Sequence, residues 1–152
     1  MLKDVEVVIC SPDKDVLLQI PGHHYNYQKN EWVNTTEESA WRFLWLQVLA
    51  GDSVDGIPGI PGIGMKKAEK AFEDLDATVF PFRALHMYVD KIIIEGDSKL
   101  NQSTVKQKID KFKETLDLVY MLKSDIDLNA YNIVLPELQI NNVLDKWKKE
   151  IQ

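Results

Sequence analysis

The stretch that decides most about this chain runs from Gly51 to Lys70 and reads GDSVDGIPGIPGIGMKKAEK. Five of the chain's seven glycines and two of its six prolines fall between Gly51 and Gly64. Glycine and proline at this density predict a loop with strong backbone demands. A short helix is expected directly after it, from Met65 to Phe72.

The end of this loop has a pattern suited to phosphate. Gly62 and Gly64 flank the apolar Ile63 at the start of the predicted helix, an arrangement typical of a helix–hairpin–helix element. Glycines allow positive φ and lack a Cβ, so backbone N–H groups can approach a phosphate, and the helix points its positive end to the same place. Added charge comes from Lys66, Lys67 and Lys70. Ile60 and Ile63 are expected to anchor the hairpin in the core. The pattern predicts that this element binds the backbone of duplex DNA independently of base sequence. The alternative is a plain Gly/Pro-rich turn between two helices.

Two pairs of carboxylates form a second pattern. Asp13 and Asp15 make a D-x-D pair after the first predicted strand, and Asp52 and Asp55 make a D-x-x-D pair after a predicted helix. If the pairs converge, four negative charges meet, which suits hard divalent cations such as Mg²⁺. Two such ions about 4 Å apart can activate water and stabilise the leaving oxygen in phosphodiester cleavage. The alternative is ordinary turn or helix-cap chemistry, in which aspartate is common.

The first 35 residues are rich in predicted strands. Val5 to Cys10 is apolar and β-branched, which predicts a buried strand of a parallel sheet, and a polar loop follows from Ser11 to Asp15. Leu17 to Ile20, His24 to Tyr27 and Glu31 to Val33 are expected to be extended, as a small β-meander.

After residue 35 the pattern changes to helices. Thr36 is a predicted N-cap, with Ser39 completing the first turn, and Gly51 is a natural stop. The apolar stripe of this helix is Trp41, Leu44, Trp45, Val48 and Leu49. Further helices are expected at Phe82–Ile94, Thr104–Leu122 and Ile140–Ile151, with a break at Gly96 and Asp97. The lysines expected to form a solvated face of the long helix are Lys106, Lys108, Lys111 and Lys113.

Composition narrows the classes of protein. The chain has 152 residues, of which 45% are hydrophobic, enough for a core, and it contains no run of 18 apolar residues that predicts a membrane span. The N-terminus lacks the pattern of a signal peptide. A single cysteine, Cys10, favours a reducing, cytoplasmic setting. The net charge of −6 argues against coating nucleic acid by bulk charge and leaves room for a local basic patch.

Two segments carry a resemblance to a known family. SPDKDVLLQ, from Ser11 to Gln19, resembles the S-x-D-K-D-L-x-Q-L segment of the 5′-nuclease domain of bacterial DNA polymerase I and of phage 5′→3′ exonucleases. QVLAGDSVDGIPGIPGIG, from Gln47 to Gly64, resembles the Q-x-L-x-G-D-x-x-D-N-I-P-G-V-P-G-I-G of that flap endonuclease family. The resemblance implies an α/β fold: residues 1–35 as the C-terminal part of a parallel-sheet nuclease core, and residues 36–152 as a helical helix–three-turn–helix DNA clamp.

The resemblance also implies a site. The implied ligands of Mg²⁺ or Mn²⁺ are Asp13, Asp15, Asp52 and Asp55. The residues expected to bind DNA are Gly59, Gly62, Ile63, Gly64, Lys66, Lys67 and Lys70. The family often holds K⁺ through backbone carbonyls of this clamp. Gly56 departs from the family, which usually has an Asn there that orders the loop through side-chain hydrogen bonds.

In the family, an N-terminal half supplies the first strands, further acidic ligands and an arch that threads the single strand, and none of this precedes Met1. We therefore expect a structure-specific 5′-nuclease fragment or subunit that binds DNA duplexes with a 5′ flap or end. Cleavage is expected when an N-terminal half, such as a separate chain, completes the site, with little or none by the chain alone. The alternatives are a non-catalytic, sequence-independent DNA-binding module, and an interaction subunit that uses the strand edge and the Trp41–Trp45 helix.

Overall fold

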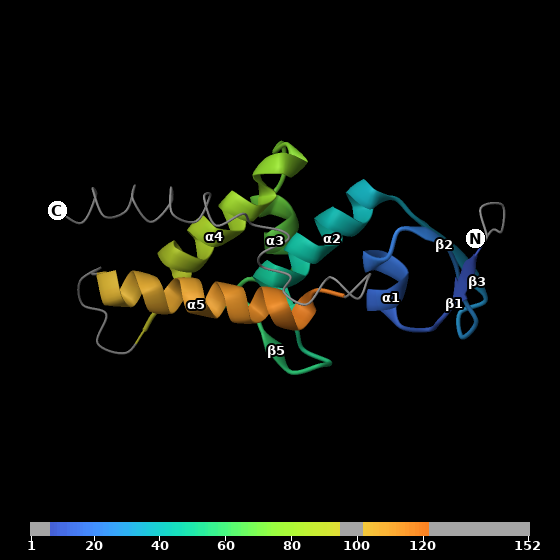
Figure 1. Ribbon diagram of the computed structural model, residues 1–152, viewed down its shortest axis with the longest axis horizontal. Coiled ribbons are helices and arrows are strands. Elements are labelled where there is room, and N and C mark those ends of the chain that lie inside the picture. The colour runs from blue at the N-terminus through green and yellow to red at the C-terminus, as the bar shows by residue number, and fades with distance from the viewer. Residues whose placement is uncertain (1–6, 95–101, 122–152) are drawn as a thin grey trace, which may run out of the picture.

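The computed structural model describes residues 7–94 and 102–121. The fold is mixed α/β, with a three-stranded sheet at one end and the longer helices at the other (Figure 1). In chain order the elements are β1 (Val8–Cys10), α1 (Lys14–Gln19), β2 (Gly22–Asn26), β3 (Glu31–Thr35), α2 (Glu37–Ala50), β4 (Gly51–Asp52), β5 (Ile57–Pro58), α3 (Met65–Ala71), the 3-10 turn η1 (Ala77–Val79), α4 (Phe80–Lys91) and α5 (Gln102–Val119). The expected break at Gly96 and Asp97 and the expected helix at Ile140–Ile151 lie outside the described residues. No helix within the described ranges is long and apolar enough to cross a membrane.

The three-stranded sheet has the order β1–β2–β3. β1 runs parallel to β2, with Val8 beside His23, and β2 pairs antiparallel with β3, with Tyr25 beside Trp32. The predicted parallel pairing of the first strand is therefore confirmed. The prediction that this strand is buried is wrong, because β1 is an edge strand of the sheet that the described residues form and Val8 is 37% exposed.

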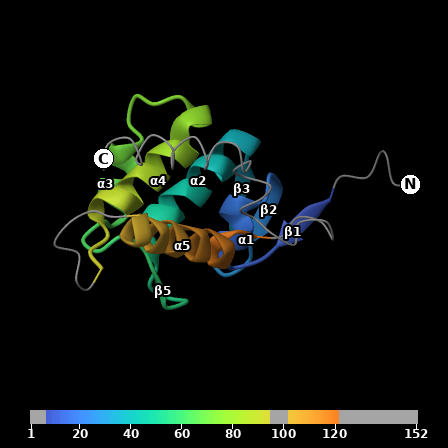
Figure 2. The same cartoon turned by 60° about the vertical axis from the view of Figure 1, so that its left-hand side comes forward.

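The segment after β1 differs from the expected β-meander. Leu17 to Ile20 was expected to be extended, but α1 is helical over Lys14–Gln19. Asp13 caps this helix, since its carboxylate accepts a hydrogen bond from the N–H of Asp15 at 2.8 Å. A short apolar run fits a buried helical turn as well as a strand, and here the cap favours the helix. Figure 2 shows α1 between the sheet and the helical region, where it packs against α2, β2 and β3.

The boundaries of α2 follow the prediction. Thr36 and Ser39 form a capping box, in which the N–H of Ser39 donates to Thr36 Oγ1 at 3.0 Å and the N–H of Thr36 donates to Ser39 Oγ at 2.9 Å. The helix ends at Gly51, whose φ of +71° lies in the left-handed region that favours glycine. Its buried stripe contains Leu44, Trp45, Val48 and Leu49, and Trp41 is partly buried against the same core.

The main core lies where α2, α4 and α5 meet. Tyr88 of α4 lies edge-on to Phe112 of α5, with ring centroids 5.4 Å apart, and Trp45 of α2 stacks on Phe112 at 6.2 Å. The hydroxyl of Tyr88 also donates a hydrogen bond to the carbonyl of Val48 at 2.7 Å. One set of buried aromatic rings therefore joins α2 to α4 and α5, which follow much later in the sequence.

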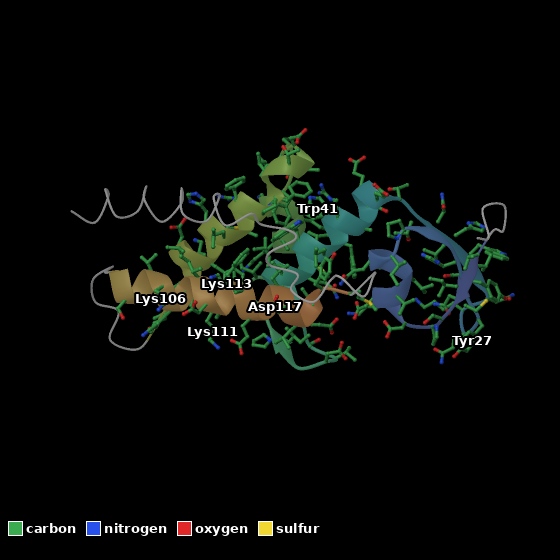
Figure 3. All side chains as sticks on the ribbon, viewed as in Figure 1. Tyr27, Trp41, Lys106, Lys111, Lys113 and Asp117 are labelled. Carbon is green, nitrogen blue, oxygen red and sulfur yellow. The ribbon has the colours of Figure 1, made fainter. Side chains whose placement is uncertain are left out.

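The predicted solvated face of α5 is partly wrong. Lys106 and Lys111 are exposed along α5, as Figure 3 indicates, and Lys113 is half-buried. Lys108 is only 4% exposed, and its Nζ donates to the carbonyl of Val89 at 3.0 Å. Val89 lies in the last turn of α4, where carbonyls lack helical partners, and the long lysine stem lets the ammonium reach it.

Candidate functional site

Three aspartates meet where α1 begins and α2 ends. Asp15 lies in the first turn of α1, Asp52 lies in β4 directly after the C-cap Gly51, and Asp55 lies in the turn between β4 and β5. Each offers one carboxylate oxygen, and the three oxygens lie within 4.8 Å of one another. The fold thus brings together one member of the D-x-D pair and both members of the D-x-x-D pair.

Asp13, the fourth predicted ligand, is placed differently. Its side chain caps α1 through the N–H of Asp15, and it is not part of the group of three. The helix start therefore separates the two carboxylates of the D-x-D pair: Asp13 faces the backbone of its own turn, and Asp15 faces Asp52.

The backbone fixes Asp52. Its Oδ1 accepts hydrogen bonds from the N–H of Val54 at 3.0 Å and from the N–H of Asp55 at 3.4 Å. The residue is only 4% exposed. Because one oxygen orders the turn that carries Asp55, the other oxygen, Oδ2, is directed to the side chains around Asp15.

A lysine ammonium lies between these carboxylates. Lys14 Nζ forms an ion pair and hydrogen bond with Asp52 Oδ2, and it lies 3.6 Å from Asp15 Oδ1. About half of the Lys14 side chain is exposed, whereas that of Asp52 is almost fully buried. The space between Asp15 and Asp52 therefore accepts a cation in this structure.

The charges in this cluster shift one another's pKa values. The hydrogen bond from Lys14 lowers the pKa of Asp52, against the effect of burial, and the N–H of Val54 lowers it further. Burial raises the pKa of Asp15, although the hydrogen bond from Gln47 and the charge of Lys14 act in the opposite direction. Burial alone would lower the pKa of Lys14, but the hydrogen bond to Asp52 and the charge of Asp15 outweigh it and raise that pKa. Asp52 and Lys14 therefore both stay charged at neutral pH.

This donor set fits a hard divalent cation. All three groups offer carboxylate oxygens, the ligands that Mg²⁺ and Mn²⁺ prefer. The ammonium of Lys14 lies against two of them, where a metal cation could bind instead. Asp15, Asp52 and Asp55 would hold the metal ion, and Lys14 would move away toward solvent.

The hairpin before α3 has an open, exposed backbone. Gly62 has a φ of +77°, and a Cβ built on Gly62 or Gly64 would meet nothing within 4 Å. Gly64 caps α3 without a side-chain hydrogen bond. Lys67 Nζ donates to the carbonyl of Gly62 at 2.8 Å, so one predicted DNA-binding residue braces the turn itself. Ile63 is half-buried and packs against the core, as predicted.

Lys66 and Lys70 are exposed on α3 and line a surface depression with Arg42 of α2. Two acidic residues, Glu69 and Glu73, line the same depression. The local charge is therefore mixed, and the basic residues come from two helices.

Gly59 lies in a tighter environment than Gly56, Gly62 and Gly64 of the same loop. A Cβ on Gly59 would lie 2.3 Å from the carbonyl carbon of Ala50 and 2.4 Å from the backbone nitrogen of Gly51. The next residue, Ile60, is 2% exposed and belongs to the core. Close packing on the end of α2 accounts for this glycine without a phosphate.

Gly56 has a φ of +70° with open space around it. Glycine and asparagine are the residues that most readily adopt this left-handed conformation. The departure from the Asn of the family pattern therefore leaves the turn geometry accessible.

Four further polar residues lie in or next to these two regions and were not singled out from the sequence. Two are cations, Lys14 beside the carboxylates and Arg42 beside the α3 lysines. The others are Gln19 and Gln47, which are both almost fully buried. A signal was present for the glutamines, because each lies at an end of one of the two segments that carry the family resemblance.

Comparison of the chain with models of protein families, with curated proteins and with solved structures finds no match.

Proposed function

We propose that this chain is part of a structure-specific, metal-dependent 5′-nuclease that acts on DNA. In this proposal the hairpin and α3 bind the backbone of duplex DNA, and Asp15, Asp52 and Asp55 contribute to a divalent-metal centre. The observation that carries the proposal is the convergence of these three carboxylates from two separate segments, with a cation already seated between two of them. Both segments are those that resemble the nuclease family.

The divalent ions and the three aspartates have different roles in the proposed reaction. Divalent ions at such a centre supply an activated water and stabilise the leaving oxygen of the phosphodiester. Asp52 provides a rigid anionic ligand, because two backbone N–H groups hold its other oxygen. Asp15 and Asp55 complete the described ligands. Further carboxylates are needed for two ions, and the resemblance assigns them to an N-terminal half.

DNA binding is supported by the exposed turn at Gly62 and Gly64 and by the lysines that follow it. Backbone N–H groups at a helix start bind phosphate irrespective of base sequence. Lys66 and Lys70 add positive charge beside Arg42. We therefore propose sequence-independent binding to duplex DNA with a 5′ flap or end.

The binding half of the proposal is tested by replacing three α3 lysines together, Lys66→Ala, Lys67→Ala and Lys70→Ala. The matched control replaces three lysines elsewhere, Lys29→Ala, Lys106→Ala and Lys111→Ala. Fluorescence anisotropy of a labelled flap duplex should show affinity reduced roughly tenfold or more in the α3 variant, with a salt dependence shallower by about one to three units of slope. Equal losses in both variants would mean that bulk charge, and not the α3 surface, binds the DNA.

The catalytic half is tested by cleavage of a 5′-flap substrate with Mg²⁺. The chain is mixed with the N-terminal half of a family 5′-nuclease, and the expected result is cleavage that requires both parts and disappears with Asp52→Asn. An uncut flap in the complete mixture would contradict nuclease function.

A second candidate is a DNA-binding module without catalysis. The observation that favours it is Lys14, whose ammonium pairs with both Asp52 and Asp15 without a metal ion. This candidate predicts that duplex binding persists in EDTA, that added Mg²⁺ does not displace Lys14, and that Asp52→Asn leaves DNA affinity unchanged. The cleavage experiment above separates the two candidates.

A further inference from the structure

Two buried glutamines connect the carboxylate cluster to the helical region. Gln47 of α2 is 1% exposed and Gln19 of α1 is 2% exposed. The Nε2 of Gln47 donates to Asp15 Oδ1 at 2.7 Å and to Asp52 Oδ2 at 3.2 Å. Its Oε1 accepts a hydrogen bond from the Nε2 of Gln19. A single amide thus bridges two carboxylates that come from different elements.

The main chain at the end of α5 fixes the orientation of both amides. Gln19 Nε2 also donates to the carbonyl of Val119 at 2.6 Å, and its Oε1 accepts from the N–H of Met121 at 3.1 Å. A carbonyl can only accept and a backbone N–H can only donate, so the amide of Gln19 cannot flip. Gln19 then presents an N–H to Gln47 Oε1, and Gln47 must turn its NH₂ group toward the carboxylates.

This network has no unused donor on either amide. The two N–H groups of Gln19 go to Gln47 and Val119, and the two of Gln47 go to Asp15 and Asp52. Breaking any one of these bonds would leave a buried polar group without a partner, which is costly. The α5 backbone therefore fixes the orientation of the Gln19 amide, and Gln19 fixes that of the Gln47 amide, which hydrogen-bonds to the carboxylates.

We propose that Gln47 is a positioning residue that holds Asp15 and Asp52 in place as metal ligands, and that Gln19 transmits the position of the α5 end to Gln47. This inference rests on the proposed function, because it concerns the same carboxylates. Neither glutamine is a ligand in this proposal. Residues that hydrogen-bond to metal ligands in this way typically contribute about 10–100-fold to metal affinity.

The test measures Mn²⁺ affinity of the full chain by titration calorimetry. Gln47→Met keeps the side-chain length and removes all its hydrogen bonds, and it should weaken Mn²⁺ binding about tenfold or more. Gln19→Met should weaken it less. The double variant should bind Mn²⁺ no more weakly than Gln47→Met alone, because Gln19 acts only through Gln47. Independent, multiplying losses would overturn the relay.

The matched control is Thr35→Val. The hydroxyl of Thr35 donates to the carbonyl of Leu17 in α1 at 2.6 Å, and Thr35 is 4% exposed, so this variant also loses a buried hydrogen bond to α1. Its Mn²⁺ affinity should equal that of the unmodified chain even if its stability falls. If the glutamine variants lose stability but keep their Mn²⁺ affinity, their role is structural and the proposal is wrong.

A measurement on the unmodified chain guards against variants that do not fold. Side-chain amide NMR should show that both Gln47 NH₂ protons exchange slowly with water and that their resonances shift when Mg²⁺ is added. Resonances that do not shift on addition of Mg²⁺ would overturn the proposal. The metal centre itself is checked with Asp52→Asn. If the unmodified chain binds Mn²⁺ no better than Asp52→Asn, the proposed metal centre is wrong, and this inference is wrong with it because it rests on that centre. If it binds Mn²⁺ and Gln47→Met binds equally well, only the positioning role fails.

Discussion

Lys14 and Asp52 form a pair in which the two partners differ strongly in exposure. Removing the ammonium leaves Asp52 as a buried, unbalanced charge close to Asp15. Lys14→Met keeps the aliphatic stem and should lower the free energy of unfolding by about 1–2 kcal/mol, between the values for exposed and buried pairs. Urea unfolding in EDTA measures this loss. Millimolar Mg²⁺ should stabilise the variant more than the unmodified chain, because Lys14 no longer competes for the carboxylates.

Lys111 supplies the control for this prediction. It pairs with Glu114 at 3.2 Å, and both side chains are well exposed. Lys111→Met should change the unfolding free energy by less than about 0.5 kcal/mol and leave the effect of Mg²⁺ unchanged. Equal Mg²⁺ stabilisation of the Lys14 variant and the unmodified chain would show that Lys14 does not occupy the cation position.

At the scale of elements, local signals predicted more than distant ones. The start and end of α2 were predictable, because a capping box and a left-handed glycine lie within a few residues of the boundary. The helix α1 was not, because its apolar run fits either conformation until the cap at Asp13 and the packing on α2 are known. Lys108 was misplaced for the same reason: its partner is Val89, on another helix.

The residues of the candidate site also divide into those that local sequence signals predict and those whose role depends on the tertiary fold. Asp15, Asp52 and Asp55 could be selected from residue type and spacing. Gln19 and Gln47 could not be given a role, since the carbonyl that orients them, Val119, is a hundred residues from Gln19 in sequence. Hydrogen bonds of this kind depend on the tertiary fold and leave no local spacing pattern.

The junction of α2 with the β4–β5 turn gives a prediction for two glycines of one loop. Gly59→Ala places a Cβ against the backbone of Ala50 and Gly51, which cannot move without disrupting the end of α2. The expected loss of stability is about 3 kcal/mol or more. Gly62→Ala meets open space and should lose only about 1–2 kcal/mol through its positive φ. Thermal or urea unfolding of both variants measures the difference.

The same pair separates packing from DNA binding. If the hairpin binds phosphate, Gly62→Ala should weaken DNA binding by more than its small loss of stability explains. The idea that Gly59 is a packing residue would be contradicted by a Gly59→Ala variant that is as stable as the unmodified chain.

For the molecule as a whole, unfolding of the helical region should be cooperative, because Tyr88 ties α4 to α2 and α5 within one core. Burial raises the pKa of Tyr88 from 10.0 to about 12. A tyrosine whose folded pKa is raised contributes stability that is complete below its unfolded pKa, so this contribution should be lost as pH rises from about 10 to about 12, to a total of about 2–3 kcal/mol.

Tyr88→Phe should lose about 1 kcal/mol at neutral pH with the hydrogen bond to Val48. It should also show a shallower fall in stability above pH 10, because phenylalanine has no proton to lose. Urea unfolding at pH 8 to 11.5 compares the two proteins, and since every other tyrosine is common to both, the difference in slope belongs to Tyr88. Parallel curves across this range would mean that Tyr88 ionises as readily in the folded chain as in the unfolded one, and that the core does not exclude water at this position.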